Sequence, residues 1–347
     1  MAIFNGKTII LGAPTAYGFS EIIERELRHQ GFEVFNLSLS PGHFKYRNIF
    51  ERLNAYLHRN FLGHPDYKTY LKFKRVEGEM LDRLAEMPRV DYALLIRPDQ
   101  YSEDIINMVS LKANKTIGYQ WDGLSRFPEV YKRINLFDRF FVFDPKDAQH
   151  PAMLPITNFY TNSFDVEPSE KHKSDVYYVG TYMKRRASQL EEIITTLQAR
   201  GLSVRYHICK SRKRKPCFKH LDTTRKDLTY GENLRFAFNS KILLDVLTTQ
   251  HHGLSFRVFE AIGFDKKLIT TNQEIRQYDF YHPNNIFVWD GQPFEKLSAF
   301  LAAPYVKLNP YIKEKYSFNR WINHLLGEGS VEEVSVQSMV LEPALAY

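Results

Sequence analysis

Two residues of opposite charge, Arg257 and Glu260, lie three positions apart in a predicted short helix. A strand predicted at Lys241–Leu247 leads into the polar loop His251-His252-Gly253-Leu254-Ser255, and the helix is predicted at Phe256–Gly263. A helix N-terminus offers unpaired N–H groups and a positive dipole end, so it can bind a diphosphate. At this spacing Arg257 could meet the anion, and Glu260 could accept two hydrogen bonds from a ribose diol.

Two residues of the loop fit the same chemistry. Ser255 is predicted to cap the helix, and Gly253 would let the backbone approach a ligand closely. The alternative is structural: an amphipathic helix with a solvated Arg257–Glu260 ion pair, which contributes about 0.3 kcal/mol. The local sequence leaves both interpretations open.

These motifs resemble those of a known enzyme family. The string Gly253-Leu-Ser-Phe-Arg-Val-Phe-Glu-Ala-Ile-Gly263, followed by a strand and Thr271, is similar to the donor-binding motif of group 1 glycosyltransferases. The likeness is closest to the branch of spore-maturation-protein-like enzymes. Val179-Gly-Thr-Tyr-Met-Lys-Arg-Arg186 resembles the turn that faces the donor in the same family. The resemblance covers about residues 175–290, and the N-terminal half matches only in its α/β pattern.

The resemblance implies a GT-B protein, in which two Rossmann-like parallel-sheet domains face each other across a cleft. It implies that Glu260 holds the donor ribose. The residues implied to lie around the diphosphate are Gly180, Thr181, Arg186 and Arg257. No separate cofactor is implied, because the nucleotide-sugar is itself a substrate. No Asp-x-Asp follows a predicted strand, so we expect no metal to bridge the diphosphate.

One position departs from the family pattern. Many group 1 enzymes have a glutamate eight residues before the position of Glu260, and its carboxylate contacts the transferred sugar. Here that position is His252. We therefore expect His251 or His252 to replace this contact, and His252 is a candidate catalytic residue.

Asp122 is the other candidate catalytic residue. It follows the predicted strand Thr116–Gln120, where it could act as general base for an acceptor hydroxyl or bind the acceptor. The alternative is that it caps a helix starting near Leu124. The loop Gly12–Gly18 resembles the first loop of GT-B enzymes but has no G-x-G-x-x-G.

The elements around these motifs alternate between strand and helix, which is typical of parallel α/β proteins. In the N-terminal half, strands are predicted at 8–11, 32–39, 92–96, 116–120 and 139–143, and helices at 19–31 and 102–111. In the C-terminal half, strands are predicted at 176–179, 202–208, 241–247, 267–271 and 285–289, and helices at 187–200, 256–263 and 293–301.

The domain organisation follows from this alternation of predicted strands and helices. We predict an N-terminal acceptor domain at 1–165 with a helical insertion at 41–88, a polar linker at Asp165–Ser174 and a donor domain at 175–303. A C-terminal helical segment follows at 304–326. The tail 327–347 has no lysine or arginine and weak periodicity, and is either a disordered end or a non-native extension.

Charge is concentrated rather than spread. The net charge is +7, and residues 205–226 hold nine basic residues against one aspartate. The cluster Lys210, Arg212, Lys213, Arg214 and Lys215 has three interpretations: a solvated loop, an anionic membrane surface or, last, nucleic acid, for which no recognised module is present. An aromatic and basic helix at 44–59, with Tyr67–Arg75, could serve the same lipid surface. Alternatively, its apolar face packs into the N-terminal domain.

Composition excludes several classes. The chain has 347 residues, 44% hydrophobic and 25% charged, which is typical of a folded protein of two domains. No apolar run reaches the roughly 18 residues of a membrane helix, and a signal peptide is not expected. Two cysteines, Cys209 and Cys217, fit a reducing compartment, and their spacing with His207 and His220 lacks the close cysteine pair of zinc sites.

These observations predict a cytoplasmic glycosyltransferase, peripheral on the inner membrane face if the basic cluster binds lipid. It would transfer a sugar from a nucleotide-sugar donor to a hydroxyl of a glycan or lipid-linked acceptor in bacterial envelope polysaccharide or lipopolysaccharide biosynthesis. The missing glutamate keeps a second interpretation open: a non-catalytic protein that binds a nucleotide-sugar or an anionic glycan. A nucleic-acid-binding α/β protein is the third alternative.

Overall fold

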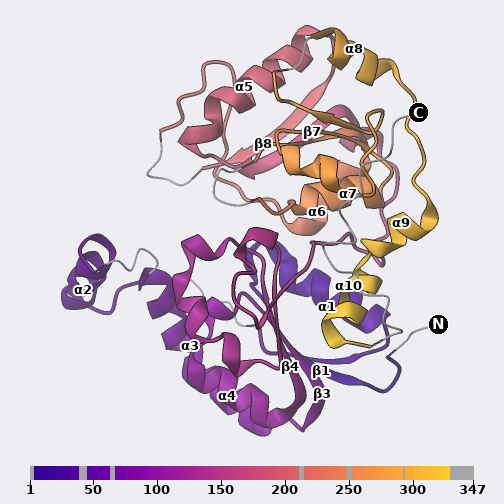
Figure 1. Cartoon of the computed structure of the whole chain (residues 1–347). Helices are drawn as coiled ribbons and strands as arrows, with labels where there is room; N and C mark the ends of the chain where they lie inside the picture. The colour runs from indigo at the N-terminus through magenta and orange to yellow at the C-terminus, as the bar shows by residue number, and fades with distance from the viewer. Residues whose placement is uncertain are drawn as a thin grey trace. The chain divides into compact units, whose positions relative to one another are not determined.

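The computed structural model describes residues 4–38, 45–62, 67–210, 215–247, 252–291 and 294–328 (Figure 1). The chain divides into two compact units. The first runs to Val142 and includes Gln149–Leu154, and the second comprises Phe143–Ala148 and the chain from Pro155 onward. The chain thus passes from one unit to the other upstream of Asp165–Ser174, the segment in which the sequence analysis places the linker.

The first unit is built on a six-stranded sheet with the order β2-β1-β3-β4-β5-β6. Its strands are β1 (Thr8–Gly12), β2 (Glu33–Asn36), β3 (Val90–Ile96), β4 (Ala113–Gln120), β5 (Arg139–Val142) and β6 (Met153–Pro155). The pairings of β1 with β2 and β3, of β3 with β4, and of β4 with β5 are parallel. The sequence analysis missed β6, which has only three residues.

The α-helices of the first unit are α1 (Phe19–His29), α2 (Ile49–Asn60), α3 (Tyr67–Glu86) and α4 (Glu103–Lys112). Ser102 caps α4, because its hydroxyl accepts a hydrogen bond from the Ile105 N–H at 3.3 Å. Short 3-10 segments lie at Ala16–Gly18, Pro98–Gln100, Leu124–Arg126, Pro128–Lys132 and Ile134–Leu136.

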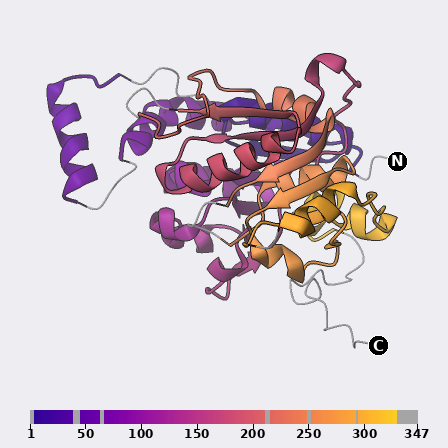
Figure 2. The same ribbon diagram turned by 90° about the horizontal axis from the view of Figure 1, so that it is seen from above.

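Helix α2 corrects one expectation. Its apolar side chains do not pack into the unit: Ile49, Phe50, Leu53 and Leu57 are 74%, 76%, 55% and 42% exposed. In both views α2 stands away from the sheet of its unit (Figures 1 and 2).

The second unit has a five-stranded parallel sheet with the order β11-β10-β9-β7-β8. Its strands are β7 (Ser174–Thr181), β8 (Val204–Cys209), β9 (Ser240–Asp245), β10 (Lys267–Thr270) and β11 (Ile286–Val288). Its α-helices are α5 (Lys184–Ala199), α6 (Tyr230–Phe238), α7 (Phe256–Gly263), α8 (Phe294–Ala302), α9 (Pro310–Lys315) and α10 (Phe318–Leu326). Three further 3-10 segments of the chain lie at Pro145–Asp147, Glu170–His172 and Gln273–Gln277.

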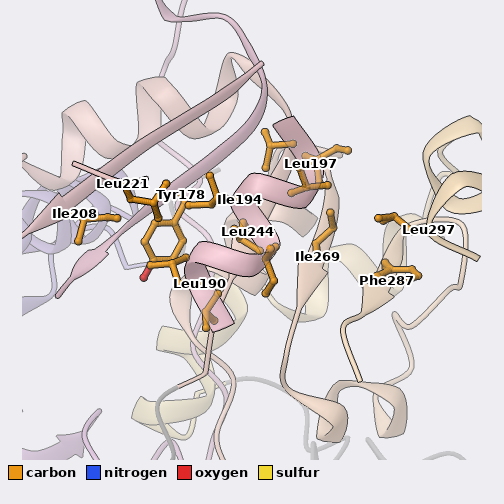
Figure 3. Packing of buried hydrophobic residues seen from close by; sticks show 14 of the residues in the cluster. Tyr178, Leu190, Ile194, Leu197, Ile208, Leu221, Leu244, Ile269, Phe287 and Leu297 are labelled. Atoms are coloured by element: carbon orange, nitrogen blue, oxygen red, sulfur yellow. The ribbon is translucent and has the colours of Figure 1, made fainter. Parts of the chain in front are cut away.

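Helices cover both faces of this sheet. Neighbouring strand residues point to opposite faces, so Tyr178 and Leu244 belong to one core cluster, and Tyr177 and Leu243 belong to another. The first cluster packs under α5 and α8, with Leu190, Ile194 and Leu197 around Tyr178 and Leu244 (Figure 3). The second packs under α6 and α7. The result is the three-layer packing of a Rossmann-like unit.

In the two sheets, three aspartates join neighbouring strands near the amino ends of those strands. Asp91, Asp138 and Asp175 each accept from both the N–H and the hydroxyl of one partner, at 2.7–2.9 Å. Their respective partners are Thr8, Thr116 and Ser203. Each partner hydroxyl also lies within hydrogen-bond distance of the N–H of its aspartate. These pairs fix strand register at the edge opposite the candidate functional residues.

Candidate functional site

The carboxyl ends of β7 and β9 form the centre of the candidate donor site. These strands are neighbours although α5, β8 and α6 lie between them in the chain. From this point the sheet continues to β8 on one side and to β10 and β11 on the other. Ligands of open parallel sheets bind outside the strand ends at such a switch point. Arg186, in the first turn of α5, spans it: Nη2 donates to the Thr181 carbonyl at 2.7 Å, and Nη1 donates to the Val246 carbonyl at 3.0 Å.

Gly180 leaves room for two side chains of this arrangement. A Cβ atom at Gly180 would lie 2.6 Å from the Tyr178 hydroxyl and 2.9 Å from Arg186 Nη2. Arg186 Nε is buried and has no hydrogen-bond partner among the described residues. The glycine therefore makes room for a guanidinium whose hydrogen-bonding capacity is only partly used.

A buried carboxylate holds the start of α7 against the same strand ends. Asp245, the last residue of β9, accepts from Ser255 Oγ and from Thr270 Oγ1, both at 2.8 Å. Ser255 is the residue before α7, as predicted, but its side chain does not cap the helix. The capping prediction is therefore wrong, because the Ser255 hydroxyl donates to Asp245 instead.

The ion pair of Arg257 and Glu260 is buried, so its interpretation as a solvated surface pair is wrong. Arg257 Nη1 pairs with Glu260 Oε2, and the side chains are only 10% and 2% exposed. Arg257 Nη2 donates to Asn233 Oδ1 at 3.1 Å, and Asn233 Nδ2 donates to Glu260 Oε1 at 3.1 Å. The Tyr177 hydroxyl also donates to Asn233 Oδ1, at 3.2 Å. The result is a closed network between α6, α7 and β7.

Burial dominates the electrostatics of Glu260. Removal from water raises the pKa of its carboxyl, while the Arg257 charge and hydrogen bonds from Tyr230 and Asn233 act in the opposite direction. The carboxylate is thus already engaged by three neighbours. A ribose at this position would have to displace Asn233 or Tyr230.

His252 lies in a group of charged side chains before α7. Its Nδ1 is 3.1 Å from Lys146 Nζ, and Lys146 Nζ also donates to Glu274 Oε1 at 3.2 Å. The backbone N–H of His252 donates to Asp144 Oδ2 at 2.6 Å. An ammonium group can only donate, so Nδ1 accepts and the ring proton is on Nε2. With 52% of its side chain exposed, His252 can donate from Nε2 to a ligand oxygen. With the ring proton on Nε2, His252 is suited to act as a hydrogen-bond donor and not as a general base.

Gly253 has a packing reason for being glycine. A Cβ atom there would lie 2.7 Å from the ring and from the carbonyl oxygen of Phe143. The close approach that the sequence predicts is therefore made to Phe143. His251 lies outside the described residues.

In the first unit, Asp122 follows β4 and pairs with Arg97 Nη1. Arg97 comes directly after β3 and also binds both carboxylate oxygens of Asp99, each at 2.7 Å. Asp122 is 29% exposed and Asp99 is 9% exposed. The segment Leu124–Arg126 has Gly123 at its N-cap position and no side-chain cap, so the interpretation of Asp122 as a helix cap is wrong.

The two cysteines considered for zinc have separate partners. Cys209 Sγ donates to Asp227 Oδ1 at 2.7 Å, and Cys217 Sγ accepts from the Tyr182 hydroxyl at 3.2 Å. Burial, with the Asp227 carboxylate, raises the pKa of the Cys209 thiol to about 11. Within the described part of the chain, no group of three potential metal ligands occurs. In the basic cluster at 210–215, Arg212, Lys213 and Arg214 lie outside that part.

Comparison with solved structures identifies the fold. The structure is similar to an alpha-glucosyltransferase in complex with UDP-glucose and DNA containing an abasic site, with a TM-score of 0.54 and 10% identity over 92% of this chain and 93% of that chain. It is also similar to the apo form of the lipopolysaccharide outer core galactosyltransferase WaaB, with a TM-score of 0.50 and 12% identity over 92% and 99% of the two chains. This chain has the GT-B fold.

The two comparisons of the sequence with known proteins found no match. No protein-family model matches the chain, and no curated protein does either. At such low identity the structural likeness extends to the fold and not to individual residues. Among the described residues, no helix is both long and apolar enough to cross a membrane.

Within the second unit of this GT-B fold, the seven predicted donor residues cluster at the strand ends and around α7. They are Gly180, Thr181, Arg186, Gly253, Ser255, Arg257 and Glu260. Sequence reasoning missed Asn233, Asp245 and Lys146. Asp245 had a detectable signal, because it is a charged residue at the end of an otherwise apolar run. Asn233 and Lys146 had none, because their partners are distant in sequence.

Proposed function

We propose that this chain is a glycosyltransferase that moves a sugar from a nucleotide-sugar to a hydroxyl group. The observation that carries the proposal is Arg186 at the switch point between β7 and β9, bonded to the carbonyl that follows Asp245, the residue that holds the start of α7. Negative charge develops on the departing diphosphate in the transition state, and preorganised donors aimed at it lower the barrier. Arg186 and the first-turn N–H groups of α7 are such donors.

We assign the other residues by their contacts. Arg257 is paired with the buried Glu260 and bonded to Asn233, so we assign it to orienting Glu260 toward the ribose. Arg186 lies at the strand ends, and we assign it to the diphosphate. His252 donates from Nε2 to the transferred sugar, in place of the family's glutamate. Asp122 is the general base for the acceptor hydroxyl, and it must leave Arg97 in part to accept a proton.

We further propose a glycan or lipid-linked acceptor from bacterial envelope polysaccharide biosynthesis, a reaction on the cytoplasmic side and no requirement for a metal ion. The resemblance of the donor motifs supports the acceptor class. Arg186 supports metal independence, because a fixed cation at the diphosphate can replace a divalent ion. The solved structures with which the fold is shared are described as glycosyltransferases, one with UDP-glucose and one of the lipopolysaccharide outer core.

The experiment measures binding and turnover separately. Calorimetry with a panel of nucleoside diphosphates identifies the base, and release of nucleoside diphosphate from the corresponding sugars, with a panel of acceptors and with chelator present, tests transfer. We expect Arg186→Met to weaken diphosphate binding at least tenfold. Arg185→Met, at the exposed neighbouring position, should leave it unchanged.

The position of the family's glutamate holds His252 in this chain, and this difference favours a second candidate function. It is non-catalytic binding of a nucleotide-sugar or an anionic glycan on the same scaffold. Tight binding without release of nucleoside diphosphate for any donor and acceptor would favour it. Failure of every nucleotide to bind would contradict sugar transfer and nucleotide-sugar binding, and would leave the anionic glycan as the ligand.

A further inference from the structure

Helix α2 is attached to its unit by its polar side. Glu51 pairs with Arg75 of α3 at 2.7 Å, Asn54 Nδ2 donates to the Tyr67 hydroxyl at 3.1 Å, and the His58 ring stacks on Tyr67 with centroids 3.9 Å apart. Of the residues of α2, Ala55 alone is buried. The hydrophobic effect ordinarily turns the apolar side of such a helix toward the protein. Here the orientation is reversed.

The apolar side forms a continuous exposed stripe. Ile49, Phe50, Leu53, Tyr56 and Leu57 recur at helical spacing over about 120° of the helix surface, and all are at least 42% exposed. Phe61 and Leu62, directly after the helix, extend the stripe and are 73% and 57% exposed. A contiguous apolar patch of this kind marks an interaction surface in soluble proteins.

The surroundings of the stripe are strongly basic. Residues 45–62 and 67–75, which comprise α2 with its flanks and the first nine residues of α3 and which we call the α2–α3 hairpin, hold eight lysine and arginine residues and one acidic residue. The other residues up to 165 hold thirteen basic and nineteen acidic residues. The hairpin therefore has a net positive charge, whereas the rest of this half of the chain has a net negative charge. Arg52 and Arg59, both exposed, lie along one edge of the apolar stripe.

We propose that the α2–α3 hairpin binds the surface of an anionic lipid bilayer. An interfacial helix buries its apolar side at the boundary between head groups and acyl chains, while its lysine and arginine side chains contact anionic head groups. Helix α2 has both features, and it stands away from the sheet of its unit in both views, as contact with a flat surface requires (Figures 1 and 2).

The charge and the apolar stripe of the hairpin argue against two other binding partners, a second copy of this chain and nucleic acid. A two-fold contact between copies of this chain would place two hairpins of the same strong positive charge against each other. Nucleic acid would satisfy the basic residues but leave the stripe of aliphatic and aromatic side chains in water. A bilayer satisfies both sets of side chains.

This binding surface is distinct from the basic cluster at 210–215 and does not depend on the proposed transferase activity. The two surfaces belong to different units. Lipid binding and nucleotide binding can therefore be measured on the same protein and can fail independently.

The test is flotation of the full chain with vesicles of phosphatidylcholine, alone or mixed with phosphatidylglycerol. We expect binding to the anionic vesicles that falls as salt rises, because salt screens the head-group charge. Phe50→Ser/Leu53→Ser should weaken binding at least tenfold, and Arg52→Glu/Arg59→Glu should do the same. The matched controls are Leu111→Ser, which changes a 70% exposed side chain on α4, and Lys296→Glu/Lys307→Glu, at two exposed lysines of the second unit.

Several outcomes would overturn the proposal. One is wild-type protein that does not float with anionic vesicles. A second is full binding by Phe50→Ser/Leu53→Ser together with loss of binding in Lys213→Glu/Arg214→Glu, which would transfer the role to the 210–215 cluster. A third is a dimer in light scattering that dissociates in Phe50→Ser/Leu53→Ser, and a fourth is tight duplex DNA binding that depends on Arg52 and Arg59. Unchanged nucleoside diphosphate affinity and melting temperature in each variant show that folding and the donor site are intact.

Discussion

Ser255 Oγ donates a hydrogen bond of 2.8 Å to Asp245 Oδ1, and this bond joins the end of β9 to the residue before α7. The N-terminus of α7 is thereby held at the carboxyl edge of the sheet. Asp245 has a second bond, from Thr270 Oγ1, of the same length. The two hydroxyls therefore provide a matched pair of variants.

Ser255→Ala should lower nucleoside diphosphate affinity about three- to tenfold, because α7 loses its link to β9. Thr270→Val removes a bond to the same carboxylate but leaves α7 linked, so its affinity should be unchanged. Each variant should lose about 1 kcal/mol in the free energy of unfolding. Calorimetry and urea unfolding give the two quantities. Equal affinity losses in both variants would mean that Ser255 acts only through general stability.

Glu260→Ala should reduce both stability and nucleotide affinity. Its removal leaves the Arg257 charge buried without its carboxylate, which costs about 3 kcal/mol in the free energy of unfolding. Loss of a charged acceptor for the ribose should weaken nucleotide binding by about 1.5–3 kcal/mol. Binding is measured below the lowered melting temperature. Asn233→Ala is the comparison: it removes one hydrogen bond to Glu260 but spares the carboxylate, so it should lower stability without the loss of nucleotide affinity. Unchanged nucleotide affinity in Glu260→Ala would remove Glu260 from the donor site.

His252→Ala should act on the sugar and not on the nucleotide. If Nε2 donates to the transferred sugar, its loss raises KM for the nucleotide-sugar about tenfold and leaves nucleoside diphosphate affinity unchanged. Lys146→Met should give a smaller effect of the same kind, because Lys146 sets the protonation of the ring. A drop in nucleoside diphosphate affinity in His252→Ala would place the histidine at the phosphates instead.

Asp122→Asn distinguishes the two stereochemical courses of transfer. In an inverting enzyme the base acts from the acceptor side, so turnover should fall about 100-fold or more with donor affinity nearly unchanged. In a retaining enzyme no separate base is required, and the effect should be smaller. Asp99→Asn changes the other carboxylate bound to Arg97 and is the control. Product configuration is determined by NMR, and an inverted product made at full rate by Asp122→Asn would contradict the role of Asp122.

Asp175 should make stability depend on acid pH. Hydrogen bonds from Lys241 and from the hydroxyl and N–H of Ser203 lower the pKa of its carboxyl to about 2, against an unfolded value near 3.9. The folded pKa is the lower one, so this stabilisation is complete above about pH 4 and disappears as the pH falls through about 2. Because Asp175 is 24% exposed, Asp175→Asn should cost only about 1–2 kcal/mol at neutral pH.

Urea unfolding at several pH values measures this contribution. The difference between wild type and Asp175→Asn should shrink as the pH falls below about 4. Asp222→Asn, at an exposed aspartate, should show no such difference. A pH-independent difference would mean that the lost hydrogen bonds, and not the charge, stabilise the sheet.

Local sequence determined the order of the elements because strand and helix periodicity are properties of neighbouring residues. The predicted limits of α7, Phe256–Gly263, are those of the structure. The short strand β6 and the helix α6 escaped detection. The motif from Gly253 to Gly263 also led to the GT-B fold, which the structure confirms.

Only the tertiary structure decided what these elements touch. Glu260 is buried because α6 brings Asn233 to it, and His252 is oriented by Lys146, which is 106 positions away in the chain. Such contacts join residues that are distant in the sequence, so strand and helix periodicity does not predict them. Periodicity likewise identifies the apolar stripe of α2 but not its direction. The polar contacts of Glu51 and His58 with α3 turn that stripe outward.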